Sequence, residues 1–198
     1  FSAAMTEVRA MLNDGLTDIN QAGSEFAFSL AGFAGYDTPS AFAEFNRAVA
    51  ATAALYDGDK SGALTALNGS YFNLSGNITE VPKHVFSQSS GDVTNPVFKG
   101  ASTAANPNNG DQIIVHNSWI NDAEAGDTRV SSKAAVRPDP SVQDELTGTH
   151  ETRLYATNVS SIDLLRNEEL ILVYAEANIG SNNTEAVAAL NVIRNAAS

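Results

Sequence analysis

The chain has 198 residues, of which 43% are hydrophobic and 17% charged, a composition typical of a folded globular protein. Its formal net charge of −12 argues against nucleic acid as a partner, because the phosphates would repel it. The absence of cysteine excludes disulfides, thiolate metal sites and cysteine nucleophiles.

The first predicted element is an amphipathic helix over residues 3–22. Apolar residues recur at spacings of three and four from Met5 to Ile19, which places them on one helical face. Gly23 should end this helix. The following segment, 24–37, is apolar but broken by glycines, and we expect a short packed loop that contains Tyr36.

A helical hairpin is predicted next. Thr38 before Pro39 is typical of a helix start, because threonine caps free amides and proline suits the first turn. Asp57-Gly58 should end the first helix, and Asp59 should cap a second one. The inner face of that second helix should carry Ala63, Leu64, Leu67 and Tyr71.

The turn of this hairpin also matches the first half of a calcium-binding EF-hand loop, from Asp57 to Gly62. Asn68 stands where such a loop needs a bidentate glutamate. We therefore favour a capped turn, and a metal ion at Asp57 and Asp59 is the alternative.

Residues 76–160 have a different character, rich in Asn, Ser, Gly and Pro. Short strands or extended pieces are predicted at 82–86, 96–98 and 112–116, and long loops elsewhere. Long loops in a compact domain are usually functional. They surround Trp119, the only tryptophan of the chain.

Trp119 lies between Asn117 and Asn121, in a polar stretch. An indole face can cover the C–H groups of a sugar while amides bond its hydroxyls. We therefore take these three residues as candidate glycan contacts, with Tyr36 as a further candidate. The alternative is that each aromatic ring anchors its loop to the core.

A second helical hairpin is predicted over 162–197. The apolar run after Ile162 favours a buried helix that Gly180 ends, and Asn182 or Asn183 should cap the next helix. The inner face of that helix should carry Val187, Leu190 and Ile193 or Arg194. Segment 186–191 echoes segment 63–68, which indicates a tetratricopeptide-type helical repeat.

Three carboxylates, Glu168, Glu169 and Glu176, lie in this hairpin. Glu169 and Glu176 share a helical face about 10 Å apart along the axis, so a glycoside hydrolase is one hypothesis. We favour structural carboxylates paired with Arg166 or Arg194. The sequence has no HExxH, GxSxG, Walker or dinucleotide motif, and we expect neither catalysis nor a cofactor.

Two motifs in this hairpin resemble the signature of the SusD/RagB family of bacterial surface glycan-binding lipoproteins. They are Arg166-x-x-Glu169-x-x-Leu172-x-x-Ala175-Glu176-Ala177 and Leu190-Asn191-x-Ile193-Arg194. The resemblance implies a mostly α fold of TPR-like hairpins with a long loop-rich insertion that contains short strands. It implies one domain over 1–198, truncated at both ends and divided into 1–75, 76–160 and 161–198.

The same resemblance implies non-catalytic binding of oligosaccharides or polysaccharides at the outer membrane, for delivery to a TonB-dependent, SusC-like transporter. The protein would be a surface lipoprotein whose anchor is not in this sequence. Asp127-Thr128-Arg129 resembles a D-x-R element of the family's insertion. The alternative function is a helical-repeat adaptor that binds a peptide or protein without binding carbohydrate.

Overall fold

The computed structural model describes residues 1–107 and 112–196. The chain divides into two compact units, which are described separately below. We call Phe1–Val85 with Ile162–Ser198 the helical unit, and Phe86–Ser161 the sheet unit. None of the helices in the described ranges combines the length and apolar character needed to cross a bilayer.

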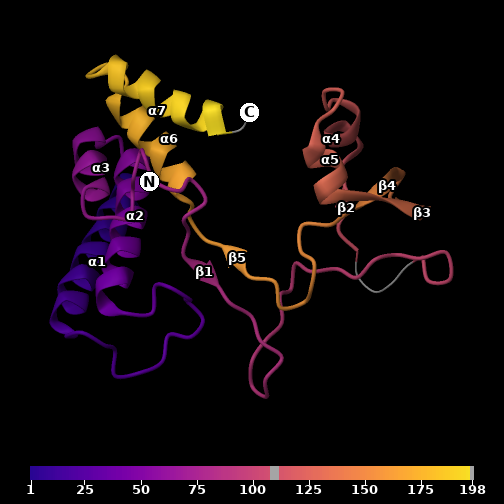
Figure 1. Cartoon of the computed structure of the whole chain (residues 1–198), viewed down its shortest axis with the longest axis horizontal. Coiled ribbons are helices and arrows are strands. Elements are labelled where there is room, and N and C mark those ends of the chain that lie inside the picture. Colours follow the sequence, from indigo (N-terminus) through magenta and orange to yellow (C-terminus); the bar gives the residue numbers. More distant parts are fainter. Residues whose placement is uncertain (108–111, 197–198) are drawn as a thin grey trace. The chain divides into compact units, whose positions relative to one another are not determined.

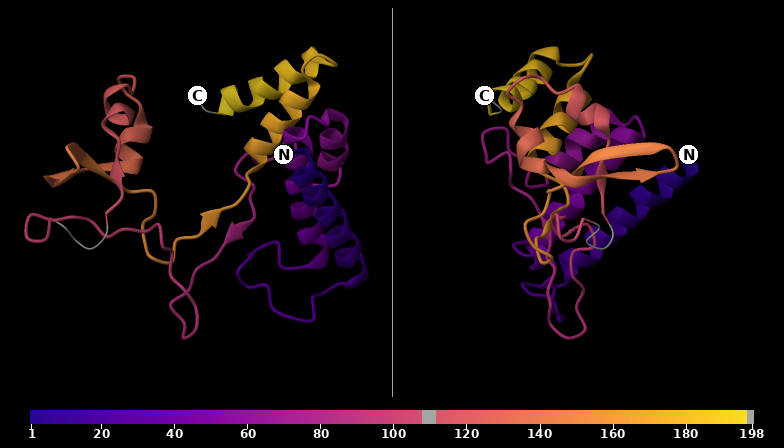
Figure 2. Two further views of the ribbon diagram at one scale, coloured as in Figure 1. Left: turned by 180° about the vertical axis from the view of Figure 1, so that it is seen from behind. Right: turned by 90° about the vertical axis from the view of Figure 1, so that its right-hand side faces the viewer.

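The helical unit contains α1 (Ser2–Gln21), α2 (Pro39–Tyr56), α3 (Lys60–Leu67), α6 (Asn167–Asn178) and α7 (Asn183–Ala196). Helix α2 packs against α1, α3 and α6, and α6 also packs against α3 and α7 (Figures 1 and 2). The predicted first helix and the two hairpins, α2–α3 and α6–α7, are thus confirmed.

The helix ends follow the expected local chemistry. Thr38 Oγ1 accepts a hydrogen bond from the Ala41 amide at 3.3 Å, and Asp59 Oδ1 accepts one from the Gly62 amide at 2.8 Å. Gly180 follows α6 with φ of +86°, a conformation that glycine adopts readily. Asn182 caps α7 by accepting from the Glu185 amide at 3.3 Å.

Alanine dominates the core of the helical unit. The buried residues that join α2, α3 and α6 are Ala48, Ala50, Ala51, Ala54, Ala63, Ala66, Leu67, Leu170, Val173 and Ala177. A smaller cluster of Ile171, Ala175 and Ala189 joins α6 to α7. Such small side chains let neighbouring helices approach closely, because the distance between helix axes depends on the residues at the contact.

One prediction about the second hairpin is wrong, and another holds only in part. Its first helix begins at Asn167, because Ile162 and Asp163 form strand β5 (Ile162–Asp163), which pairs antiparallel with β1 (Lys83–His84). The inner face of α7 carries Ala186 and Ala189, with Ile193 packed beside them as predicted, while Val187 and Leu190 are 57% and 47% exposed. Close packing on α6 places the smallest side chains at the interface and turns the larger ones outward.

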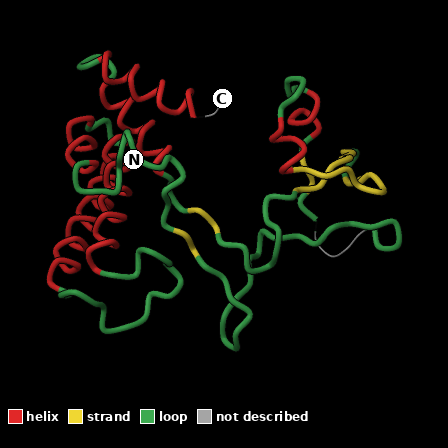
Figure 3. The backbone as a smooth tube through the Cα atoms, viewed as in Figure 1, coloured by secondary structure: helices red, strands yellow, loops and turns green. Residues whose placement is uncertain are grey.

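The sheet unit contains β2 (Ile114–Val115), α4 (Asn117–Asn121), α5 (Thr128–Lys133), β3 (Ala134–Gln143) and β4 (Leu146–Thr152). The strands form an antiparallel sheet in the order β2-β4-β3, and loops make up much of the rest (Figure 3). Strands within 82–86 and 112–116 are confirmed. The strand predicted at 96–98 is wrong, because Asn95 Oδ1 accepts the amides of Val97 and Phe98 in a turn.

The β3–β4 hairpin was predicted as loop, and the chain is mixed α/β, with 43% helix and 13% strand. The expected mostly α class therefore holds only in part. Pro138 and Pro140 argue against a strand, but β3 lies at the sheet edge and its register shifts between Val136 and Ser141. An edge or bulge tolerates proline because fewer ladder hydrogen bonds are required there.

A buried ion cluster joins the parts of the sheet unit. Arg137 Nη1 lies 3.0 Å from Glu151 Oε2, and both side chains are 1% exposed. Glu151 also pairs with Arg153 and accepts the Ser102 amide at 2.9 Å. Arg137 Nη2 donates to the Pro107 carbonyl at 2.9 Å. The cluster thus ties β3 and β4 to segment 102–107.

Burial raises the pKa of the Glu151 carboxyl, but its hydrogen bonds from Ser102 and Arg153 outweigh burial. The pKa therefore lies below its ordinary value. Because an ionised carboxylate is needed to satisfy so many donors, the ion cluster is stable only while Glu151 is deprotonated.

Leu170→Ala should destabilise the helical unit by about 2–5 kcal/mol, because this side chain is fully buried between α2, α3 and α6. Urea unfolding followed by far-UV circular dichroism measures the change. The matched control is Leu172→Ala on the same helix, where the side chain is 45% exposed and the expected change is within about 0.5 kcal/mol. Equal effects of the two substitutions would contradict this packing.

Glu151→Gln should destabilise the sheet unit by about 3–5 kcal/mol, because it leaves the Arg137 charge buried without a counter-ion. Trp119 fluorescence during denaturant unfolding reports on this unit, since it contains the only tryptophan. Glu124→Gln, at an exposed position of the same unit, is the control and should leave the unfolding midpoint unchanged. An unchanged midpoint for Glu151→Gln would refute the role given to the cluster.

The same cluster predicts acid sensitivity. The pKa of Glu151 is lower in the folded protein than in the unfolded chain, where glutamate titrates at about 4.3. Ionised Glu151 therefore contributes its full stabilisation of the folded state above about pH 4.3, and this contribution is lost as the pH falls through the folded-state pKa. The unfolding midpoint of the sheet unit should therefore fall as pH drops below about 4.3. Because the amide introduced by Glu151→Gln cannot titrate, that variant should show a shallower fall, and parallel profiles would count against this linkage.

Candidate functional site

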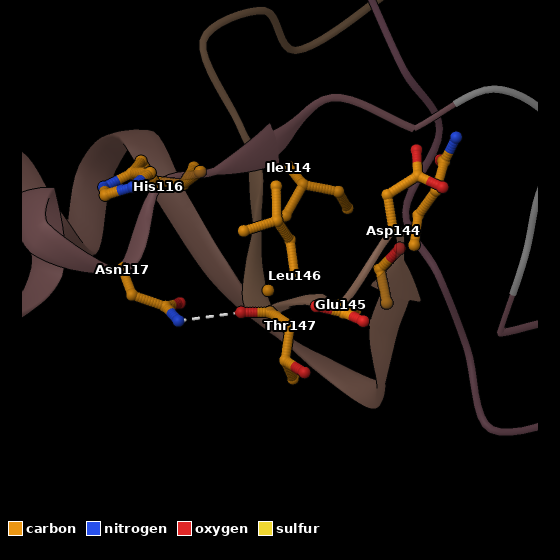
Figure 4. A pocket seen from close by; sticks show the side chains of 11 residues that line it. Ile114, His116, Asn117, Asp144, Glu145, Leu146 and Thr147 are labelled. Atoms are coloured by element: carbon orange, nitrogen blue, oxygen red, sulfur yellow. Dashed lines mark hydrogen bonds between the residues drawn. The ribbon is translucent and has the colours of Figure 1, made fainter.

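A cavity of about 550 Å³ lies in the sheet unit, between the start of α4 and the end of the β3–β4 hairpin (Figure 4). The β2–α4 segment lines it with Ile114, Val115, His116 and Asn117, and the hairpin lines it with Ser141, Gln143, Asp144, Glu145, Leu146, Thr147 and Gly148. The site is thus built by two segments that are distant in the sequence.

The apolar part of the cavity depends on a glycine in β4. A Cβ at Gly148 would lie 2.1 Å from Ile114 Cγ2, so the Ile114 side chain can cross the strand only because residue 148 has no side chain. Leu146, at the start of β4, is 74% exposed. Together Ile114 and Leu146 give the cavity an apolar surface.

Asn117 fixes the polar side of the cavity. Its Nδ2 donates to the Thr147 carbonyl at 2.7 Å, drawn as the dashed line in Figure 4, and joins α4 to β4. Its Oδ1 is buried and accepts no hydrogen bond from any residue in the described ranges. A buried acceptor without a donor costs about 1–3 kcal/mol.

Two carboxylates, Asp144 and Glu145, form the turn of the hairpin at one end of the cavity. Both residues are exposed and have positive φ, 49° and 66°. Within the described part of the chain their carboxylates make no hydrogen bond or ion pair. Because no Lys or Arg lines the cavity, its polar end is negatively charged.

The predicted glycan contacts on α4 are only partly brought together. Asn117 lines the cavity, whereas Trp119, which is 41% exposed, and the exposed Asn121 do not. Residues two apart in a helix do not face the same way, so Trp119 points elsewhere than Asn117. Its indole is accessible on the surface of the same short helix.

Tyr36 belongs to the helical unit and is only 5% exposed. Its ring packs edge-on against Tyr71 at 5.3 Å between ring centres, and its hydroxyl donates to Glu80 Oε1 at 3.3 Å. Burial, with the nearby Glu80 carboxylate, raises the pKa of Tyr36. The tyrosine is thus a core residue and does not line the cavity.

A second cavity of about 440 Å³ lies between α4, α5 and β3. It is lined in part by Asp127, whose carboxylate caps α5 through the Arg129 amide at 2.9 Å and pairs with Arg129 Nη2 at 2.6 Å. These contacts with Arg129 lower the pKa of Asp127 to about 2. The D-x-R element therefore stabilises the start of a helix.

The turn that matched an EF-hand loop is occupied by an arginine side chain. Arg9 Nη1 lies 2.9 Å from Asp57 Oδ2, and Arg9 Nη2 pairs with Asp59. Asp59 also caps α3. In the described ranges no group of three or more His, Asp or Glu residues could hold a metal ion.

The carboxylate of Glu169 caps the start of α6. Glu169 Oε1 accepts the Arg166 amide at 3.0 Å, while the Arg166 guanidinium lies 2.8 Å from Asp163 Oδ2. The predicted pairing of Glu169 with the Arg166 side chain is therefore wrong, because the helix start needs the carboxylate as a cap. Glu169 and Glu176 are both exposed.

Most of the cavity was not foreseen, because its hairpin was predicted as loop. The missed residues are Ser141, Gln143, Asp144, Glu145, Leu146, Thr147 and Gly148. A signal was available in Leu146–Thr152, which contains three threonines, a residue favoured in strands. The turn itself lacks the Asn-Gly or Asp-Gly pair that usually marks a two-residue hairpin loop.

Comparison of the chain with protein-family models, with curated proteins and with solved structures found no match. The SusD/RagB resemblance thus stays a prediction from two short motifs in residues 166–194. Among the features described above, the cavity around Asn117 combines apolar and polar groups in a space large enough for a small ligand.

Proposed function

We propose that the chain is a non-catalytic carbohydrate-binding protein, and that an oligosaccharide or a segment of a polysaccharide binds in the cavity of the sheet unit. The observation that carries the proposal is the pairing of an apolar surface, Ile114 and Leu146, with polar groups on Asn117, Gln143 and Thr147. Sugar rings present apolar C–H faces and hydroxyls together, which such a surface can bind. The volume also lies within the range of about 300–1,000 Å³ usual for small-ligand sites.

The resemblance of the α6–α7 hairpin to the SusD/RagB signature supports the same proposal from a different part of the chain. On that basis the two hairpins are TPR-like elements of a SusD-like fold. The protein is then a surface lipoprotein of a bacterial outer membrane that delivers glycans to a TonB-dependent, SusC-like transporter. This wider setting rests on the motifs alone.

The carboxylates favour binding over hydrolysis. A glycosidase needs a pair of carboxyl groups on either side of the scissile bond, one of them protonated through its environment. Glu169 and Glu176 are exposed on α6, and Glu169 is already engaged as a helix cap. We therefore propose no catalytic role for them.

An adaptor function is the second candidate, and exposed apolar side chains favour it. Leu172 on α6 and Val187 and Leu190 on α7 are 45%, 57% and 47% exposed. A protein partner that covers them would gain hydrophobic contact. Leu190→Asp should then abolish partner binding and leave glycan binding unchanged.

Asn117→Ala should weaken glycan binding about tenfold, because it removes a polar group from the cavity wall. The wild type is first titrated with a panel of polysaccharides by calorimetry and Trp119 fluorescence, and the variant with those that bind. Asn121→Ala on the same helix is the matched control and should keep the wild-type affinity.

Two results would contradict the proposal. The first is an absence of heat and of fluorescence change with every glycan of the panel. The second is an equal loss of affinity in Asn117→Ala and Asn121→Ala, which would place the binding site outside the cavity.

A further inference from the structure

We propose that the turn formed by Asp144 and Glu145 makes the cavity selective for glycans that carry protonated amino groups. This inference rests on the proposed function, since it assigns the ligand class of the same cavity. It follows from the charges, contacts and backbone geometry of the turn, taken together with the apolar and amide groups beside it.

One end of the cavity carries two negatively charged side chains. Figure 4 shows Asp144 and Glu145 at the end opposite His116. Neither carboxylate has a hydrogen-bond or ion-pair partner in the described ranges, and no Lys or Arg lines the cavity. A ligand amine would therefore meet two uncompensated negative charges, whereas a uronate or sulfate would be repelled by them.

The residues of the turn are not those that its backbone conformation favours. Both positions have positive φ, where residues with a side chain are disfavoured and where Asn followed by Gly is the preferred pair. Asp144 and Glu145 therefore weaken the hairpin, and their carboxylates bring no compensating contact within the described structure. Binding of a cation gives these two side chains a role that the fold does not.

The position of the turn restricts the ligand further. The carboxylates lie beside Leu146 and across the cavity from Asn117, so that an amine at the turn would leave the rest of the ligand against apolar and amide groups. An amino sugar can contact all three kinds of group: its amine meets the carboxylates, its C–H face meets the apolar side chains, and its hydroxyls meet the amides. A simple cation can contact only the carboxylates.

The test is the double variant Asp144→Asn with Glu145→Gly, titrated by calorimetry with glucosamine, N-acetylglucosamine and galacturonic acid oligomers of equal length. For the wild type we expect glucosamine oligomers to bind roughly three- to tenfold more tightly than the N-acetylated ones, at a pH where amines and carboxylates are both charged. The preference should shrink at high salt, since exposed charges are screened. The variant should lose this preference and bind the uronate more tightly than the wild type does.

The variant also separates binding from folding. Because Asn-Gly suits the turn, its thermal unfolding midpoint should rise while its affinity for glucosamine oligomers falls. The control is Asp122→Asn with Glu124→Gln, which removes the same charge from exposed positions outside this cavity and should keep the preference for the amine.

The outcomes distinguish the two proposals. Binding of no oligosaccharide would overturn the proposed function and this inference with it. Equal binding of glucosamine and N-acetylglucosamine oligomers, unchanged in the double variant, would overturn the inference alone. Binding of a lysine oligopeptide as tightly as the glucosamine oligomer would also overturn it, because the cavity would then recognise a cation and not a sugar.

Discussion

The sheet unit depends on the buried carboxylate of Glu151. Only Phe86 and Ala134 are buried apolar residues in the described part of this unit, so it has little hydrophobic core. The Arg137–Glu151 pair is buried instead, and it is joined by Ser102 and Arg153. Burying two charges is unfavourable unless their remaining hydrogen-bonding groups are satisfied, and here backbone and side-chain donors and acceptors satisfy them. The strands that carry the cavity are held in place by this polar cluster.

The helical unit is stabilised in a different way. Its core is built from alanines and a few larger residues, such as Leu67 and Leu170, at the contacts of α2, α3 and α6. Hydrophobic packing of this kind depends little on pH, whereas an ion cluster depends on the charge of each member. The core of the helical unit is therefore expected to be less sensitive to acid than the ion cluster of the sheet unit, and acid should act on the helical unit through surface pairs such as Arg9 with Asp59.

The structural features that could be predicted from the sequence are those that depend on residues close together in the chain. Thr38, Asp59 and Gly180 occupy helix ends for reasons visible within a few positions, and the structure confirms each of them. The start of α6 was misplaced because Ile162 pairs with His84, far away in the sequence. Ile193 packs on the inner face of α7 as predicted, whereas Val187 and Leu190 do not, because hydrophobicity alone does not show how closely two helices pack.

The candidate site was foreseen only in part, for a similar reason. The polar stretch around Trp119 correctly drew attention to Asn117, but local composition does not show the direction in which each side chain of a short helix points. Tyr36 was chosen for its glycine-rich surroundings and is buried against Tyr71. Asp144 and Glu145 reach the cavity because they form the turn of the β3–β4 hairpin. This hairpin was not predicted, because two prolines in β3 interrupt the usual sequence pattern of a strand.

The pairing of β1 with β5 has a consequence for how the chain can change. Lys83 lies opposite Asp163 and His84 opposite Ile162, so residues 86–161 leave and re-enter the helical unit at adjacent points, about 5 Å apart as in any paired strands. The entropic cost of closing a loop rises only slowly with the number of residues in it, so a change in the length of this segment costs little free energy. The helical unit is therefore suited to act as a constant frame, in which one inserted segment can be lengthened, shortened or exchanged for another without rebuilding the helices around it.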